Sequence, residues 1–189
     1  MCGRYTLYTD EQAEEIRQIV EIAQRQVQGQ LKLGEVYPSD RAPILVANQD
    51  KVVVRTAVWG FPGFQGRSLL INARSETAAE KPLFHKPLLA SRCVVPTTGF
   101  YEWNTAKEKF LFQYADSTVV YLAGLCEIFE GQRRYTILTT SPNQAVRAVH
   151  NRMPVLLSHD CVRAWLTDTD AALEMLRAEP PELVGKPMA

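Results

Sequence analysis

Residues 93–103 read Cys-Val-Val-Pro-Thr-Thr-Gly-Phe-Tyr-Glu-Trp, the stretch of this 189-residue chain that decides its fold class. Residues 93–96 form a short apolar run typical of a strand, and they lead into the aromatic and polar cluster Gly99–Trp103. The same pattern recurs further along the chain, over residues 110–115, 118–125 and 134–139, with turn pairs at Asp116-Ser117 and Glu130-Gly131. A series of short strands joined by turns favours an antiparallel sheet.

More short strands are predicted on both sides of this series. Residues 44–47 and 52–59 favour a hairpin that turns at Asn48-Gln49-Asp50. Alternating or apolar runs predict short strands over residues 4–8, 69–72 and 155–157. The segment from Tyr37 to Pro43 is expected to be an extended loop, because each of its two prolines disfavours helix at the residue before it.

A few helices interrupt the strands. A helix over residues 10–28 is predicted by the capping-box pair Thr9 and Gln12 and by apolar residues at helical spacing. Shorter helices are expected over residues 75–80, 143–149, 160–166 and 171–178, with Lys81-Pro82 ending the first and a cap near Ser141 starting the second. We therefore predict an α+β fold, a curved, largely antiparallel sheet forming a half-open barrel with a few flanking helices, in which residues 1–189 are a single domain.

Composition points to an ordinary globular protein. Hydrophobic residues make up 46% and charged residues 22% of the chain, close to the average for such proteins. We expect no membrane span, since no run of about 18 apolar residues is present, and no secretory signal, so a bacterial cytoplasm is the expected compartment. The cysteines form no C-x-x-C pair, which argues against zinc and against a disulfide framework; we expect neither metal nor cofactor, and inert buried thiols at Cys93, Cys126 and Cys161.

The net charge is zero, but its distribution is uneven. Residues 1–28 carry five acids and three bases, and residues 168–189 carry five acids and two bases. The segment between them carries 16 bases and 11 acids, and arginine outnumbers lysine 14 to 7 over the whole chain. Arginine binds phosphate in a bidentate manner, so the distribution indicates nucleic-acid contact, although a solvated arginine-rich surface explains it equally well.

The chain begins Met1-Cys2-Gly3-Arg4. Removal of Met1 would expose a cysteine whose α-amine, with an ordinary pKa of about 8, is partly unprotonated near neutral pH. Such an amine condenses with an aldehyde to give an imine, and the thiol then closes a five-membered thiazolidine ring. A cysteine at position 2 also occurs by chance, and its surroundings decide whether it reacts.

Three polar clusters lie beside predicted strands. They are Asn72-Ala73-Arg74-Ser75-Glu76-Thr77, Gly99-Phe100-Tyr101-Glu102-Trp103 and His150-Asn151-Arg152-Met153-Pro154. Taken singly, Glu102 is equally well a paired structural carboxylate, His150 a helix-end residue and Asn72 a turn residue. No G-x-S-x-G, H-E-x-x-H, Walker or G-x-G-x-x-G motif is present, which excludes the commonest hydrolase, zinc-protease and nucleotide-binding classes.

These clusters, in this order after an initial Met-Cys-Gly-Arg-Tyr, resemble the SRAP (SOS response-associated peptidase) family from Cys2 to about Trp165. The resemblance implies a protein that recognises abasic sites in single-stranded DNA and crosslinks to them through Cys2, in a single turnover of lyase-like Schiff-base chemistry. Cys2, Asn72, Glu102 and His150 are then the expected catalytic residues. His150 is suited to proton transfer during sugar ring opening, Glu102 to proton transfer at the imine steps, and Asn72 to holding the sugar or the Cys2 backbone.

DNA contacts are expected at two kinds of side chain. Arg4, Arg74 and Arg152 lie one or two residues from proposed catalytic groups and are expected to bind the flanking phosphates. Aromatic and proline side chains before the second cluster are expected to stack on bases, namely Trp59, Phe61, Pro62 and Phe64. Trp59 and Phe61 also fit a sheet core. The family usually has a tryptophan where this chain has Phe64.

Two other functions stay open from the sequence. In the first, Cys2 acts as the nucleophile of an N-terminal cysteine peptidase of the SOS response, assisted by Glu102 and His150. In the second, the chain binds modified bases without chemistry. The expected partner is single-stranded DNA containing abasic sites, with the protein on the nucleoid when bound; a monomer is expected, and the sequence names no protein partner.

Overall fold

A computed structural model describes residues 2–9, 13–27, 31–63, 66, 68–115 and 119–188. Its centre is a ring of five strands in which each strand pairs with the next and the last pairs with the first. In order round the ring these are β3 (Arg41–Asn48), β4 (Lys51–Trp59), β12 (Gln132–Thr140), β11 (Val120–Phe129) and β8 (Arg92–Thr97). The β12–β4 pair is parallel and the other four pairs are antiparallel. The predicted curved, largely antiparallel sheet is confirmed, and its ring of pairings closes where a half-open barrel was expected.

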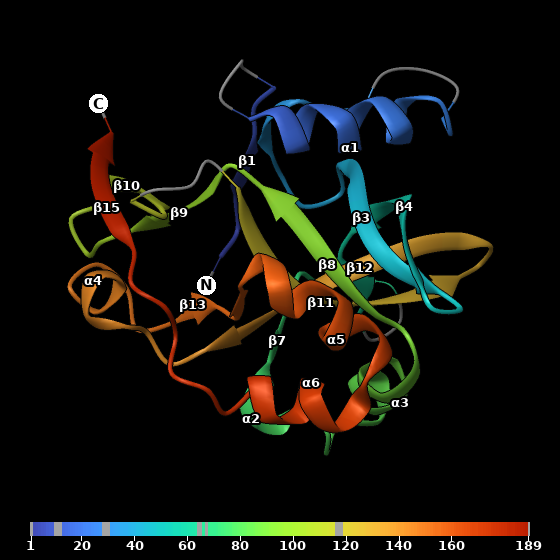
Figure 1. Cartoon of the computed structure of the whole chain (residues 1–189). Coiled ribbons are helices and arrows are strands. Elements are labelled where there is room, and N and C mark those ends of the chain that lie inside the picture. The colour runs from blue at the N-terminus through green and yellow to red at the C-terminus, as the bar shows by residue number, and fades with distance from the viewer. Residues whose placement is uncertain are drawn as a thin grey trace.

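A second sheet of five strands lies beside the ring, in the order β15 (Val184–Met188), β10 (Lys109–Gln113), β9 (Gly99–Trp103), β1 (Tyr5–Leu7) and β2 (Gly34–Val36). All four of its pairings are antiparallel. Figure 1 shows β9, β10 and β15 on the left of the molecule, with the blue start of the chain running through its middle. The second sheet therefore contains strands from both ends of the chain, since β1 comes from its beginning and β15 from its end.

Short strands extend the ring. The two-residue strands β13 (Met153–Pro154) and β14 (Leu156–Leu157) pair with β12 and β11. Strand β7 (Asn72–Arg74) runs parallel to β12, with Asn72 opposite Ile137. The pair β5 (Phe61–Pro62) and β6 (Leu69–Leu70) forms a small separate sheet. These additions bring the first and third polar clusters of the sequence to the same strand, β12.

Helices pack around the ring and the second sheet. They are α1 (Glu14–Gln24), α2 (Ser75–Ala78), α3 (Pro82–Ala90), α4 (Gln144–Arg147), the 3-10 turn η2 (His159–Cys161), α5 (Val162–Thr167) and α6 (Thr169–Met175). Figure 1 shows α1 at one end of the molecule and α2, α3, α5 and α6 at the other. No helix in the described ranges has the length and apolar character needed to cross a membrane.

Three helix predictions need correction. The helix predicted over residues 10–28 runs only from Glu14 to Gln24; residues 10–12, with the capping-box residue Gln12, and residue 28 lie outside the described ranges. Pro82 was expected to end a helix and instead begins α3. A proline at the first position of a helix loses no hydrogen bond there and already has a helical φ angle, so Lys81-Pro82 is equally a start signal. The cap of α4 is Asn143, which accepts a hydrogen bond from the Val146 N–H at 3.0 Å, and not Ser141.

The buried side chains form two clusters, one on each side of the ring. Because successive residues of a strand point to opposite faces, each ring strand contributes to both. The inner cluster includes Ile44, Trp59 and Ile137, and the outer one, under the helices, includes Leu45, Leu138 and Trp165. Cys2 belongs to the inner cluster and is completely buried. The sequence near the N-terminus is therefore part of the central core.

Candidate active site at the inner face of the second sheet

Cys2 lies in the inner core just before β1. Its side chain is 0% exposed, and its Sγ lies 3.8 Å from the Arg4 carbonyl oxygen. Burial raises the pKa of the Cys2 thiol well above its usual range, and the nearby Glu102 carboxylate raises it further. The thiol is therefore protonated near neutral pH and needs a neighbouring base before it can act as a nucleophile.

Glu102 is the neighbouring acid–base group. It lies on β9, on the same face as the core residue Phe100, and only 2% of it is exposed. Burial raises the pKa of Glu102 to about 7. A carboxyl group with this pKa is present in both protonation states at neutral pH, so it can both donate and accept a proton there.

His150 completes this group from the chain that follows α4. Its Nδ1 lies 3.9 Å from Glu102 Oε2 and accepts a hydrogen bond from the Arg152 N–H at 3.1 Å. Burial lowers the pKa of His150, so the neutral ring dominates near pH 7. Glu102 and His150 thus have pKa values shifted toward each other by the same cause, burial, acting on a carboxylate and on an imidazolium. The structure brings Cys2, Glu102 and His150 close to one another, and their catalytic role stays a prediction.

Asn72 lies on β7, beside β12. Its Oδ1 and Nδ2 are both buried, and neither has a hydrogen-bond partner among the described residues. A buried amide without partners costs about 1–3 kcal/mol, so such a group in a folded protein calls for an explanation, such as a role in binding. Asn72 makes no hydrogen bond to the other three predicted catalytic residues within the described chain.

Two of the three predicted phosphate-binding arginines already contact carboxylates. Arg152 donates to both oxygens of Glu76, at 2.6 and 2.9 Å, and to the Thr139 carbonyl at 2.6 Å. Arg4 donates to Glu35 at 3.2 Å. Arg74, at the exposed end of β7, forms no salt bridge within the described part of the chain.

The predicted base-stacking residues need a correction. Trp59 and Phe61 are 0% exposed. The Trp59 ring stacks against Tyr135 with 6.2 Å between centroids, and its Nε1–H donates to the Ile71 carbonyl at 3.0 Å. Both residues therefore serve as sheet core, the alternative that their sequence also fitted. Pro62 is half-buried, and Phe64 lies outside the described residues.

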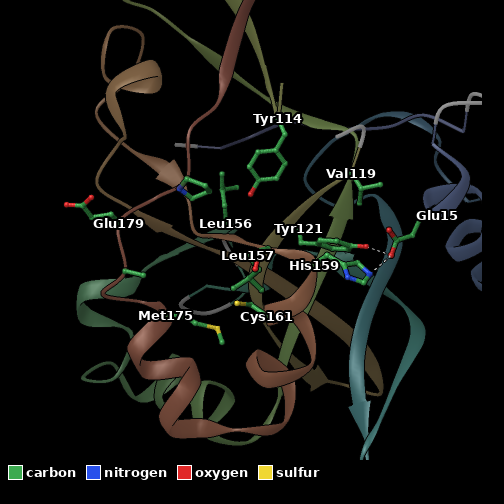
Figure 2. A pocket seen from close by; sticks show the side chains of 13 residues that line it. Glu15, Tyr114, Val119, Tyr121, Leu156, Leu157, His159, Cys161, Met175 and Glu179 are labelled. Carbon is green, nitrogen blue, oxygen red and sulfur yellow. Dashed lines mark hydrogen bonds and ion pairs between the residues drawn. The ribbon is translucent and has the colours of Figure 1, made fainter. Parts of the chain in front are cut away.

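A separate cavity of about 450 Å³ lies elsewhere in the molecule (Figure 2). In it the Tyr121 hydroxyl donates to the Glu15 carboxylate, and His159 Nε2 lies 3.5 Å from the same carboxylate. Cys161, expected to be buried, is half-buried at this cavity. None of the described residues that the sequence nominated for function lines it. Within the described ranges, no group of three or more His, Cys, Asp or Glu side chains is placed to hold a metal ion.

Comparison with known proteins agrees with the fold and shows the family. Residues 1–186 match the family model described as SOS response associated peptidase (SRAP). The abasic site processing protein YoaM of Bacillus subtilis is 31% identical over 193 residues, which cover 94% of this chain and 84% of that protein. The abasic site processing protein YedK of Escherichia coli is 29% identical over 140 residues, 69% of this chain and 63% of that protein. A crystal structure of a Bacteroides thetaiotaomicron protein has a TM-score of 0.81 at 21% identity and covers 100% of this chain and 92% of its own.

Proposed function

Since the chain belongs to the SRAP family, we propose that it captures abasic sites in single-stranded DNA as a covalent adduct of Cys2, after removal of Met1. Two of its relatives carry the name abasic site processing protein, and abasic sites present an aldehyde when their sugar ring is open. The observation that carries the proposal is the placement of the buried Glu102, with a pKa of about 7, next to Cys2 and 3.9 Å from His150.

The proposed reaction has three steps. The Cys2 α-amine adds to the C1′ aldehyde of the open sugar to give a carbinolamine, which loses water to give an imine. The Cys2 sulfur then adds to the imine carbon while the nitrogen takes up a proton, and this closes the thiazolidine. The overall change is the loss of one water, and no oxidant or metal is required.

Each protein group has one task in this sequence. His150, neutral near pH 7, accepts the sugar hydroxyl proton during ring opening and returns it. Glu102 protonates the departing carbinolamine hydroxyl and is then the base that takes the proton of the buried Cys2 thiol. The orphaned amide of Asn72 offers one donor and one acceptor to the sugar. Ring closure matters because an imine left open promotes β-elimination and strand cleavage.

The test is to incubate the protein with an oligonucleotide that contains one abasic site and to separate the products under denaturing conditions. The proposal predicts an adduct that survives denaturation and forms with abasic single strands but not with undamaged ones. Failure to form any adduct with protein that begins at Cys2 would contradict it.

A second candidate is the peptidase activity in the family's description. It uses the same three residues, with Cys2 as the nucleophile toward a peptide carbonyl. Removal of Met1 from the chain itself does not distinguish the two candidates, because ordinary methionine removal gives the same product. Repeated cleavage of an added peptide would favour the peptidase, whereas no turnover alongside adduct formation favours the DNA proposal.

A further inference from the structure

One face of the second sheet points away from the inner cluster, and we call it the outer face. On it, Glu35 accepts hydrogen bonds from three side chains. Its Oε2 accepts from the Tyr37 hydroxyl at 2.6 Å and from Arg4 Nη1 at 3.2 Å, and its Oε1 accepts from Lys109 Nζ. Glu35 comes from β2, Arg4 precedes β1 and Lys109 begins β10. One quarter of the Glu35 side chain is exposed, so this group of charges lies at the surface.

Aromatic rings hold the two cations in place. The Arg4 guanidinium lies over the ring of Tyr37, 4.4 Å from its centroid, and over that of Trp103 at 4.9 Å. The Lys109 ammonium lies 3.9 Å from the centroid of the Tyr101 ring. Cation–π contacts of this kind fix the direction in which the cations present their N–H groups. Two oriented cations and a hydroxyl that converge on one anion form the donor set that a phosphate group requires.

We propose that Arg4, Lys109 and Tyr37 form a binding subsite for one backbone phosphate of single-stranded DNA, and that the Glu35 carboxylate occupies this subsite in the free protein. The inference rests on the proposed function, and it adds two phosphate ligands and a competing anion to that function. A DNA phosphate must therefore displace the Glu35 carboxylate from the subsite. This displacement lowers the binding free energy gained from the phosphate contact.

The subsite is connected to the reactive cysteine through Arg4. The side chain of Arg4 belongs to the outer face, but its carbonyl oxygen accepts a hydrogen bond from the Tyr101 N–H at 2.9 Å and lies 3.8 Å from Cys2 Sγ. Trp103, which contacts Arg4, directly follows Glu102. A phosphate bound here would therefore hold the DNA strand next to Cys2 and Glu102, the residues proposed to carry out the reaction.

The experiment measures the affinity for a fluorescein-labelled undamaged single-stranded oligonucleotide over a series of salt concentrations, so that no crosslink forms. We compare the wild type with Glu35→Gln and with Glu108→Gln. Glu108 is a matched control: it lies next to Lys109, and its carboxylate accepts from Asn104 Nδ2 at 2.6 Å. Both variants remove one negative charge from the same region, but only Glu35→Gln frees Arg4 and Lys109.

Glu35→Gln is expected to bind at least threefold more tightly at low salt. Its plot of log affinity against log salt should be steeper by about 0.7, since one phosphate contact to a single strand contributes about 0.7. Glu108→Gln should leave the slope within about 0.3 of the wild type. In the double variant Glu35→Gln, Lys109→Gln, the added slope should shrink, because the one phosphate then meets Arg4 without Lys109.

An unchanged or shallower slope for Glu35→Gln, with a folded protein by circular dichroism, would overturn the subsite and show that Glu35 only braces the strands. In that case abasic crosslinking by the wild type would still stand. If the wild type neither binds nor crosslinks single strands, the proposed function fails and the subsite fails with it.

Discussion

Glu102 and Glu35 show what the two faces of one sheet do to the same side chain. Glu102, on the inner face, is 2% exposed, and burial raises its pKa to about 7. Glu35, on the outer face, accepts hydrogen bonds from Lys109 and Tyr37, and these lower its pKa to about 2. Burial disfavours a charge and hydrogen bonding to the charged form favours it. The inner carboxyl group is therefore able to move protons at neutral pH, while the outer one is a fixed anion.

The same alternation separates the residues proposed for chemistry from those proposed for DNA binding, along β9 and the residues before β1. Cys2 and Glu102 face the core, and Arg4 and Trp103 face outward. Because successive strand residues point to opposite faces, one short stretch supplies both functions without crowding. Substitutions on the inner face should therefore change the rate of crosslinking, whereas substitutions on the outer face should change the affinity for DNA.

The largest expected effect is at Cys2. Cys2→Ala retains the α-amine but lacks the thiol, so it should form an imine that cannot close. We expect complete loss of the stable adduct, together with cleavage of the abasic strand by β-elimination, on a denaturing gel. Cys161→Ala, which removes the half-buried thiol at the separate cavity, is the control and should crosslink as the wild type does. A wild-type yield of stable adduct from Cys2→Ala would disprove the thiazolidine.

Glu102→Gln should slow crosslinking by about 100-fold, the usual contribution of a general acid–base group. The amide keeps the shape of the carboxyl group but cannot exchange a proton with the carbinolamine or the thiol. Rates are measured at saturating abasic oligonucleotide so that binding does not limit them. Glu108→Gln is the control, and a Glu102→Gln rate within threefold of the wild type would remove Glu102 from the mechanism.

Stability should depend on pH with opposite sign at the two glutamates. The pKa of Glu102 is 4.5 in the unfolded reference and about 7 in the folded protein. Its contribution to the free energy of unfolding is therefore fully present below pH 4.5 and falls as the pH rises to about 7. Relative to the wild type, Glu102→Gln should therefore gain stability between pH 5 and pH 8, on the order of 1–3 kcal/mol.

Glu35→Gln should behave in the reverse manner. The folded pKa of Glu35 is about 2, so its contribution is present above pH 4.5 and is lost as the pH falls toward 2. The variant should be less stable than the wild type at pH 7, and the gap should narrow at pH 3.5. Urea unfolding at pH 3.5, 5 and 8 checks both variants, and equal trends for the two would contradict the difference between the faces.

The smallest effect on stability is expected at Asn72. Because its amide has no hydrogen-bond partner in the described chain, Asn72→Ala should lower the free energy of unfolding by no more than about 1 kcal/mol. The same variant should crosslink more slowly than the wild type under subsaturating oligonucleotide. A loss of several kcal/mol with normal crosslinking would make Asn72 a structural residue.

The strands were predictable because their patterns are local. The hairpin of β3 and β4 turns at Gln49 and Asp50, and Glu130-Gly131 joins β11 to β12 with both residues at positive φ, as a tight hairpin turn requires. Closure of the ring was not predictable, because it depends on the parallel pairing of β4 with β12, about 75 residues apart.

The site was predictable in part for a similar reason. The short motifs around Cys2, Glu102 and His150 predicted that these residues act together, and the structure places them close to one another. Contacts between distant residues were not predictable: Arg4 meets Glu35 across 31 residues, and Arg152 meets Glu76 across 76. Trp59 and Phe61 have the composition of a stacking surface, but their place on ring and neighbouring strands makes them core. Aromatic content alone does not distinguish these two environments.

The most direct test of the account is the intact mass of the protein after incubation with an abasic oligonucleotide. The account predicts one species whose mass is that of the chain without Met1 plus that of the oligonucleotide, less one water. The same species should be absent with an undamaged oligonucleotide. An adduct that retains Met1, or no adduct from a chain that begins at Cys2, would contradict the capture of the lesion by the N-terminal cysteine.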